Sequence, residues 1–324
     1  MIEIKNLSKK YGENEILKNI NLTINSREIF GLVGSSGAGK STILNCINGI
    51  DEYQNGSILV DGIKIESLSS SELRKMRKNI GVVFQNASLL KRKDVFQNIS
   101  LPLECWGYDR AFIKDRVYKL AEMVGIENKL NSRPDELSGG QRQRVCIARA
   151  LTLEPKYLLS DESTSALDPK TTLSILELIK QIHKEIGLTV VFVTHEMQVI
   201  QNICERMAIL EDGNISDCGY VTEMFLNKPK SLQRLLGKEE IELPEEGVNL
   251  SFNLLSDTVN MPILCDLVKI SENKISIVDA KFYNSVSGKI CNITINLVKE
   301  DLCVTTNYLK SKNILFKIIE NGGR

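Results

Sequence analysis

The sequence predicts two parts: an α/β domain with a mainly parallel sheet, then a smaller α+β domain. Residues 1 to about 235 alternate strand-like and helix-like patterns, which favours a sheet covered by helices. Ile29–Val33 and Thr189–Thr194 are continuous apolar runs, typical of central strands buried on both faces. After residue 248, apolar and polar residues alternate in short segments, as in half-buried strands.

The first part contains three stretches with a helical pattern, at Ser71–Lys78, Ala111–Val124 and Thr171–Glu185. An acidic stretch, Lys238–Gly247, interrupts the alternation, and we interpret it as a solvated linker rather than a binding site. We therefore expect a first domain at 1–237, a linker at 238–247 and a second domain at 248–324.

The second domain is predicted to have the element order β-α-β-β-α-β, the ferredoxin-like pattern. Its expected elements are a strand at 248–254, a helix at Thr258–Lys269, strands at Ile275–Phe282 and Cys291–Leu297, a helix at Glu300–Lys310 and a strand at Asn313–Ile319. The alternation implies that helices cover one face of this sheet and that the other face is open or used for pairing.

Composition narrows the class of protein. The 324 residues carry 41 Lys+Arg and 41 Asp+Glu, so the formal net charge is zero and nothing draws the whole chain to nucleic acid or anionic lipid. Hydrophobic residues make up 42% of the chain, which argues against disorder as the main state. The length allows roughly two domains.

No apolar run approaches the roughly 18–20 residues that span a bilayer. The first residues, Met1–Lys5, lack the pattern of a secretory signal, so we expect a cytosolic chain that is able to dock on a membrane protein. The eight cysteines form no C-x-x-C pair and only two histidines accompany them. We therefore expect reduced, buried, structural thiols and no zinc site.

A glycine-rich segment follows the run Ile29–Val33 and precedes a helix-like stretch, and it matches G-x-x-x-x-G-K-[ST]. Its predicted nucleotide-binding residues are Gly34, Ser35, Ser36, Gly37, Ala38, Gly39, Lys40, Ser41 and Thr42. Glycines let backbone N–H groups curl around phosphate oxygens, and the helix N-terminus adds positive potential. Lys40 should bridge the β- and γ-phosphates of ATP, and the Ser41 hydroxyl should hold Mg²⁺. The alternative, a glycine-rich turn without a ligand, does not explain the strand-then-helix context.

A second segment, Tyr157–Glu162, is an apolar strand that ends in two acids. Asp161 is placed to bind Mg²⁺ through water, and Glu162 is the candidate general base for the attacking water. Many strands end in solvated acids, so this pair gains its meaning from the glycine-rich segment upstream.

The third segment, Leu137–Gln141, reads Leu-Ser-Gly-Gly-Gln. Small residues at a helix start form a backbone nest suited to a γ-phosphate. With this segment the chain resembles the ATPase subunits of ATP-binding-cassette (ABC) transporters, whose signature is LSGGQ. In that family the signature of one subunit caps the nucleotide held by the other. The resemblance therefore implies a head-to-tail homodimer in which Ser138, Gly139, Gly140 and Gln141 contact the partner's ATP.

Other positions of that family are also filled. The resemblance implies that Tyr11 stacks on adenine, although a lone tyrosine would otherwise be interpreted as a surface or core residue. It implies that Gln85 senses Mg²⁺ and the attacking water, that Ser165–Asp168 crosses between subunits and that His195 contacts the γ-phosphate. The end of a central strand, where His195 lies, is also where open α/β sheets bind ligands. His183, inside a helical pattern, is given a structural role.

In transporters of this family the region after the glutamine forms a groove for a cytoplasmic helix of the membrane subunit. Core packing explains most of the apolar residues here, and Trp106 is a candidate for an exposed docking residue. The apolar residues of this region are Leu89, Leu90, Val95, Phe96, Leu101, Leu103 and Trp106.

Three kinds of ABC protein compete: an importer ATPase, an exporter ATPase, and an ATPase acting on DNA or ribosomes. The chain has one cassette, no long coiled coil between the two phosphate-binding motifs and no membrane helices. We therefore expect a separate subunit, peripheral on the cytoplasmic face of a bacterial membrane, that partners integral-membrane permease subunits and no nucleic acid.

The small tail is similar to that of the bacterial methionine-importer ATPases, and the resemblance covers essentially the whole chain. It implies two ATPase subunits, two membrane subunits and an extracytoplasmic methionine-binding protein. It also implies that the tail binds cytosolic methionine and inhibits import, with a ligand zone at Glu272–Ala280 and the neighbouring turn Tyr283–Lys289. Two alternatives remain open: the substrate is another amino acid or small solute, and the tail only dimerises through an exposed strand edge.

Overall fold

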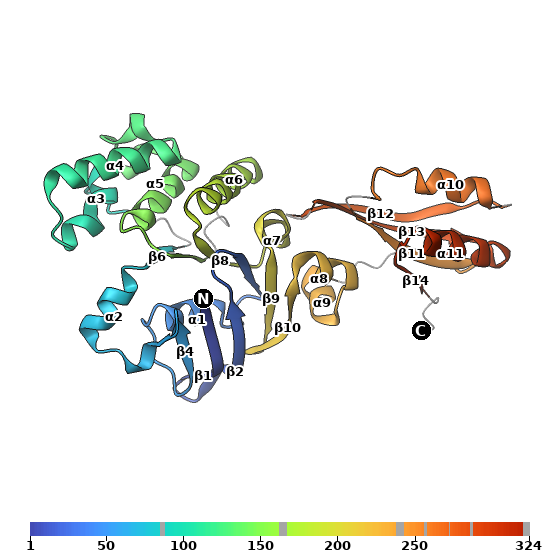
Figure 1. Cartoon of the computed structure of the whole chain (residues 1–324), viewed down its shortest axis with the longest axis horizontal. Coiled ribbons are helices and arrows are strands. Elements are labelled where there is room, and N and C mark those ends of the chain that lie inside the picture. The colour runs from blue at the N-terminus through green and yellow to red at the C-terminus, as the bar shows by residue number, and fades with distance from the viewer. Residues whose placement is uncertain are drawn as a thin grey trace. The chain divides into compact units, whose positions relative to one another are not determined.

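The computed structural model describes residues 1–84, 88–161, 167–237, 243–255, 258–271, 273–285 and 288–319. Contacts divide the chain into two compact units, Met1–Tyr220 and Val221–Arg324, and each is described by itself (Figure 1). This division falls earlier than the predicted domain end at 237, so helices α8 (Val221–Asn227) and α9 (Lys230–Leu236) group with the second unit. Residues 238–242, half of the predicted linker, lie outside the described residues.

The first unit contains a four-stranded antiparallel sheet in the order β2-β1-β4-β5. Its strands are β1 (Ile2–Tyr11), β2 (Asn14–Ile24), β4 (Asn55–Val60) and β5 (Ile63–Lys64). β1 and β2 bury alternate residues, which is the pattern of strands with one face on the core.

A six-stranded sheet in the order β10-β9-β3-β8-β7-β6 forms the centre of the first unit. Its five neighbouring strands from β9 to β6 are parallel, and β10 adds an antiparallel edge. Every residue of the two central strands is buried, as the continuous apolar runs predicted. The strands are β3 (Ile29–Val33), β6 (Ile80–Val83), β7 (Tyr157–Asp161), β8 (Thr189–Thr194), β9 (Arg206–Glu211) and β10 (Asn214–Tyr220).

Helices join the parallel strands, and several begin at a side-chain cap that the sequence supplies. Ser69 caps α2, Asp109 caps α4 and Asp168 caps α6 by accepting from a backbone N–H three residues on. The three predicted helices are confirmed to within two residues at each end. The helices are α1 (Lys40–Ile47), α2 (Ser70–Arg77), α3 (Val95–Cys105), α4 (Arg110–Val124), α5 (Gly139–Leu151), α6 (Pro169–Ile186) and α7 (Met197–Ile203).

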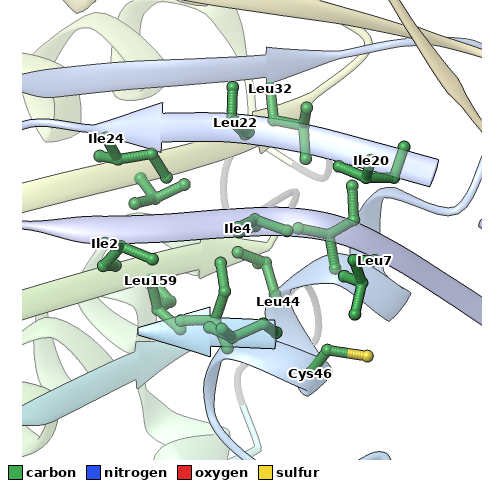
Figure 2. Close-up of a cluster of buried hydrophobic side chains, with 14 of the residues drawn as sticks. Ile2, Ile4, Leu7, Ile20, Leu22, Ile24, Leu32, Leu44, Cys46 and Leu159 are labelled. Atoms are coloured by element: carbon green, nitrogen blue, oxygen red, sulfur yellow. The ribbon is translucent and has the colours of Figure 1, made fainter. Parts of the chain in front are cut away.

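The core of the first unit lies between its two sheets and α1. Figure 2 shows Ile2 and Ile4 of β1 and Ile20 and Leu22 of β2 on one side, with Leu44 of α1 facing them. Each of these side chains is at most 5% exposed. At roughly 25 cal/mol per Å² of apolar surface, this burial is the main force that holds α1, and with it the glycine-rich segment before it, against the sheets.

From β11 onward, the second unit has the predicted element order β-α-β-β-α-β. Its sheet is antiparallel and runs in the order β12-β13-β11-β14. The first helix is shorter than predicted because Pro262 stands before its first turn. The elements are β11 (Val248–Leu254), α10 (Ile263–Ile270), β12 (Ser276–Ser285), β13 (Gly288–Leu297), α11 (Leu302–Ser311) and β14 (Phe316–Ile319).

The two faces of this second sheet differ in chemistry. Leu250, Phe252 and Ile295 belong to an apolar cluster that includes α10 and α11. The opposite face is polar: Asn292 Nδ2 donates to Asn253 Oδ1 at 2.8 Å. Asn249, also on this face, is fully buried and donates to the Pro244 carbonyl, so the segment that contains Pro244 covers part of the face predicted to be open or used for pairing.

All eight cysteines are free thiols, as expected for reduced cysteines, but only four of them are buried. The expectation of buried thiols is wrong for Cys105, Cys218, Cys265 and Cys303, which are exposed. The reason is amphipathicity, because a small residue fits the solvent side of a helix or edge strand as easily as the core. Among the described residues, no helix combines the length and apolarity needed to cross a bilayer, and no group of three potential metal ligands occurs.

Candidate nucleotide-binding site

The glycine-rich segment connects the buried strand β3 to α1, as predicted. Gly37 and Gly39 have φ angles of +80° and +104°, a region that side chains with a Cβ rarely adopt. At Gly34 the constraint is space instead, because an added Cβ would lie 2.3 Å from the Leu210 carbonyl oxygen of β9. The glycines therefore allow a tight turn at the carboxyl end of the sheet that leads directly into the first turn of α1.

Lys40 is the first residue of α1, and its side chain folds back over the loop. Its ammonium donates to the carbonyl oxygens of Gly34 and Ser35, each at 2.9 Å, and the residue is only 5% exposed. A nearly buried cation therefore lies at the helix N-terminus, where unpaired backbone N–H groups add further positive potential. This combination makes the turn a strong anion site.

Two oxygen-bearing side chains from distant parts of the chain meet beside the turn. The Ser41 hydroxyl donates to Asp161 Oδ1 at 3.0 Å, although 120 residues separate them. β7 carries Asp161 at its carboxyl end and pairs with β8 in the centre of the sheet. A hydroxyl and a carboxylate are ligand types that suit Mg²⁺, so the residues present fit this ion.

A cavity of about 370 Å³ lies over the turn and collects the residues predicted to hold nucleotide. Its volume lies within the range of small-molecule sites. A neighbouring cavity of about 270 Å³ shares Ser36 and Gly37 and adds Ser35 and Ala38. The first cavity is lined by Tyr11, Ile16, Ser36, Gly37, Gly39, Lys40, Ser41 and Thr42.

Tyr11 lies at the end of β1 and lines the same cavity as Lys40. Its ring is 47% exposed, which fits a surface for stacking rather than a core residue. Its hydroxyl donates to Asp51 Oδ2 at 2.5 Å, and this bond to a carboxylate raises the pKa of Tyr11 above its usual value.

The signature segment starts helix α5, as expected. Ser138 and Gln141 form a reciprocal cap: the Gln141 N–H donates to Ser138 Oγ at 3.3 Å, and the Ser138 N–H donates to Gln141 Oε1 at 2.9 Å. Gly140 packs so closely on α6 that an added Cβ would lie 2.5 Å from Thr171 Cγ2. The signature residues do not line the cavity over the glycine-rich turn.

The remaining predicted residues lie after a strand, at the start of a helix, or outside the described residues. His195 follows the last residue of β8 and is exposed. Asp168 caps α6 by accepting from the Thr171 N–H at 3.0 Å, and the hydrogen bonds from Thr171 lower the pKa of Asp168. Gln85 and Glu162 lie outside the described residues, so their assigned roles stay predictions.

Some residues around the site were missed by sequence reasoning. Asp51 holds the Tyr11 hydroxyl, Ile16 lines the first cavity, and Asp212 and Gly213 line the second. In the sequence, Asp51 stands out only by its place just after α1. A single acidic residue in a polar loop is too common to indicate a role in binding. These contacts depend on which loops the fold brings together.

The parallel sheet, the glycine-rich turn after β3 and the acid at the tip of β7 define a nucleotide-binding protein of the P-loop class. Comparisons then narrow this class. A family model described as ABC transporter matches residues 17–165. The Methionine import ATP-binding protein MetN of Clostridioides difficile (strain 630) is 46% identical over 321 residues, covering 99% of this chain and 100% of the relative. The protein of the same name from Clostridium acetobutylicum is 44% identical, with 98% and 100% coverage.

Solved structures agree with this result. A dimeric post-hydrolysis state of the ATP-binding cassette MJ0796, bound to ADP and Pi, is similar with a TM-score of 0.63 and 38% identity. That match covers 68% of this chain and 99% of the other. The cbiO1 protein of Clostridium perfringens, part of the ABC transporter complex cbiONQ, has a TM-score of 0.66 at 30% identity and covers 74% and 95% of the two chains.

The chain belongs to the family of these methionine import ATP-binding proteins, within the ABC transporters. It is accordingly an ATP-binding cassette with ATPase activity. The family assignment made from the signature Leu137–Gln141 is confirmed.

Proposed function

We propose that this chain is the ATPase subunit of a bacterial methionine importer and docks on permease subunits at the cytoplasmic face of the membrane. The assignment of methionine as the substrate rests on the full-length similarity to relatives named as methionine import proteins. The site supports ATP as the energy source, because the buried Lys40 ammonium, the N-terminus of α1 and Ser41 meet at one cavity, and Ser41 bonds to Asp161.

In this proposal each residue has a defined task. The glycine-rich turn and Lys40 hold the β- and γ-phosphates, and Tyr11 stacks on adenine. Ser41, Asp161 and Gln85 would hold Mg²⁺, which supplies charge neutralisation for phosphoryl transfer when it is bound. Glu162 accepts a proton from the attacking water, while His195 contacts the γ-phosphate. The proposal for Lys40 is supported by its burial and its position over the loop.

We further propose that two copies close head to tail, with the signature of each capping the nucleotide of the other. The signature starts a helix and does not line the P-loop cavity of its own chain, which supports a role toward a partner. A similar cassette is dimeric in its structure with ADP and Pi. Closure would then drive the permease, and hydrolysis would reopen the dimer.

The Glu162→Gln variant tests this cycle. The amide cannot accept the proton of water, so we expect ATP to be bound but not turned over, and a closed dimer to accumulate. Size-exclusion chromatography with ATP measures the dimer, and phosphate release measures turnover. Glu154→Gln is a matched control, because this acid is exposed and remote in sequence from the P-loop. Normal hydrolysis by Glu162→Gln would contradict the assignment of the base.

A groove of about 470 Å³ in the first unit is the proposed docking site for a permease helix. Its wall includes Leu90 and Phe84, each 42% exposed, and the cationic residues Lys78 and Arg149. Trp106, the earlier candidate, is half-buried under the cations of Arg74 and Lys78, 5.0 and 5.2 Å from its ring centroid, and does not line this groove. The docking proposal therefore rests on Leu90 and Leu101.

Within the second unit we propose a ferredoxin-like domain, with its limits at 248–324, that binds methionine and inhibits transport. The strand order and antiparallel pairing support the fold. Within the predicted ligand zone, Asp279 Oδ2 is buried without a hydrogen-bond partner among the described residues and lies 3.8 Å from Lys281 Nζ. An acid and a base side by side match the ammonium and carboxylate of an amino acid.

Calorimetry of the full chain with methionine, with leucine and cystine as controls, tests the sensing role. We expect selective methionine binding that Asp279→Asn weakens and that Glu300→Gln, an exposed control in the same unit, leaves intact. Equal heats for all three ligands, or none, would contradict methionine sensing and leave the substrate open to another amino acid or small solute.

The second candidate for this unit is dimerisation alone. β12 is an edge strand with two exposed apolar residues, Ile277 at 57% and Phe282 at 72% exposure. An edge of this kind is a template for pairing with another chain. Under this alternative, Phe282→Ser would abolish a nucleotide-independent dimer in sedimentation analysis, and methionine would change neither mass nor ATPase rate.

A further inference from the structure

The ring of Tyr11 is fixed from a side of the protein that takes no part in phosphate binding. Its hydroxyl donates to Asp51 Oδ2 at 2.5 Å. Asn45 Nδ2 donates to the same oxygen at 3.2 Å, and the Asp51 N–H bonds back to the Asn45 carbonyl at 3.3 Å. The carboxylate is thus held by the last turns of α1 on one side and by the Tyr11 hydroxyl on the other.

The start of α1 and the loop after its end both connect to the cavity. The first residues of α1, Lys40 and Ser41, line the cavity directly. The loop after α1 supplies Asp51, which reaches the cavity only through Tyr11. Asn45 of α1 holds Asp51, so the position of the Tyr11 hydroxyl depends on the same helix whose first residues line the cavity.

Lys9 covers one face of the same ring. It is 7% exposed, and its Nζ lies 4.5 Å from the ring centroid while it donates to the Glu52 carbonyl. Lys9 does not line the cavity, whereas Tyr11 does. A cation on one face of an aromatic ring is attracted by its negative π-surface and leaves the other face for a planar ligand.

We propose that Asp51 is a positioning residue for nucleotide binding: it orients the Tyr11 ring, with Lys9 behind it, so that the ring presents one face to the adenine base. This inference rests on the proposed stacking role of Tyr11. Asp51 touches no phosphate, so its contribution depends on the base alone and is absent for a ligand without one.

The expected effect follows from one charge-assisted hydrogen bond. A hydrogen bond to a charged group contributes about 1.5–3 kcal/mol, and only the part that orients the ring affects the ligand. We expect binding of the base to weaken about 3- to 10-fold, which corresponds to about 1 kcal/mol. Asp51→Ala removes the acceptor, and Tyr11→Phe removes the donor while keeping the ring. Tyr11→Phe also removes the contact of the hydroxyl with Thr42, so the decisive comparison is the Tyr11→Phe background. If the bond to Asp51 carries the effect, adding Asp51→Ala to Tyr11→Phe costs nothing further.

The experiment is calorimetric titration of the full chain with two probes, AMP-PNP, which has an adenine, and tripolyphosphate, which has none. We expect Asp51→Ala to weaken AMP-PNP about 3- to 10-fold and to leave tripolyphosphate unchanged. Glu66→Ala is the matched control, because it removes a similar bond from the Tyr53 hydroxyl, at 2.7 Å, away from the cavity. This control should change neither probe.

The outcomes separate the inference from the proposed function. Equal weakening of both probes by Asp51→Ala would show a general loss of structure and overturn the inference, and so would no weakening of either. A further loss from Asp51→Ala in the Tyr11→Phe background would show that Asp51 acts by another route and would also overturn it. Failure of the unaltered chain to bind AMP-PNP would overturn the nucleotide site itself.

Discussion

Two glycines of the P-loop should respond differently to replacement by alanine: Gly34 mainly in stability, and Gly37 mainly in affinity for nucleotide. At Gly34, an added Cβ would lie 2.3 Å from the Leu210 carbonyl oxygen, about 1 Å inside the 3.4 Å at which ordinary contact begins. Leu210 is fully buried in β9, so neither the oxygen nor its strand has room to move. At Gly37, nothing lies within 4 Å of an added Cβ, and the cost arises from a φ of +80° alone.

These geometries give different magnitudes. Overpacking against fixed backbone costs about 3 kcal/mol at the upper end of its usual range, so Gly34→Ala should lower Tm by about 6–12 °C for a protein of this size. A non-glycine residue with positive φ costs about 1 kcal/mol, so Gly37→Ala should lower Tm by about 2–4 °C. Gly37 lines both cavities, so its variant should nevertheless lose affinity for AMP-PNP.

Differential scanning calorimetry with and without AMP-PNP measures both effects in one set of scans. We expect Gly34→Ala to show the lower Tm without ligand, and Gly37→Ala to show the smaller rise in Tm when ligand is added. Equal melting temperatures for the two variants, or a lower one for Gly37→Ala, would refute this reasoning. It holds that steric crowding requires glycine at position 34 and that the positive φ angle requires glycine at position 37.

Three further predictions concern charge and capping. Lys40→Ala should reduce kcat/KM for ATP at least about 100-fold, because it removes the buried ammonium at the phosphate site, and phosphate release measures this; unchanged turnover would contradict the role. Ser138→Ala removes the cap of α5, so it should lower stability by about 1 kcal/mol and abolish ATPase activity. Asp109→Ala removes the cap of α4, so it should lower stability by a similar amount and keep the activity. ATPase activity in both variants would contradict a role for the signature. Burial opposes ionisation of Asp61, but hydrogen bonds from Tyr157 and Lys156 outweigh it and lower the pKa of Asp61 to about 2. The stabilisation is therefore complete above about pH 4 and disappears as pH falls through 2, so the Tm difference between the unaltered chain and Asp61→Asn should shrink between pH 4 and pH 2, and a constant difference would contradict it.

Features encoded by neighbouring residues could be predicted from the sequence. The limits of β3 and β8 were predicted to the residue, because an unbroken apolar run has one stable place in a sheet covered on both faces. The P-loop and the signature were recognised because glycines and a cap are local requirements of a turn and a helix start. The family followed from these segments, since each has a distinctive spacing.

Side-chain exposure was harder to predict. Four thiols expected in the core are exposed, and Asn249, on a face expected to be open or used for pairing, is buried against the segment that contains Pro244. For the thiols, a small residue fits the solvent side of a helix or edge strand as easily as the core, whereas for Asn249 the deciding contact comes from a segment whose position is set by tertiary packing. A pattern along one strand predicts which residues share a face but not what covers that face.

By itself the sequence determined the class of fold, the P-loop, the signature and the family, because these depend on residues within a few positions of one another. The sequence also assigned Ser41 and Asp161 to one metal site, and the structure brings the two side chains together across 120 residues. Only the tertiary structure decided that Asp51 holds the ring of Tyr11. The physical reason is the range of the interactions. Turns, caps and periodic burial are set by local backbone geometry, whereas a hydrogen bond between distant side chains exists only after the packed sheets and α1 have brought them together.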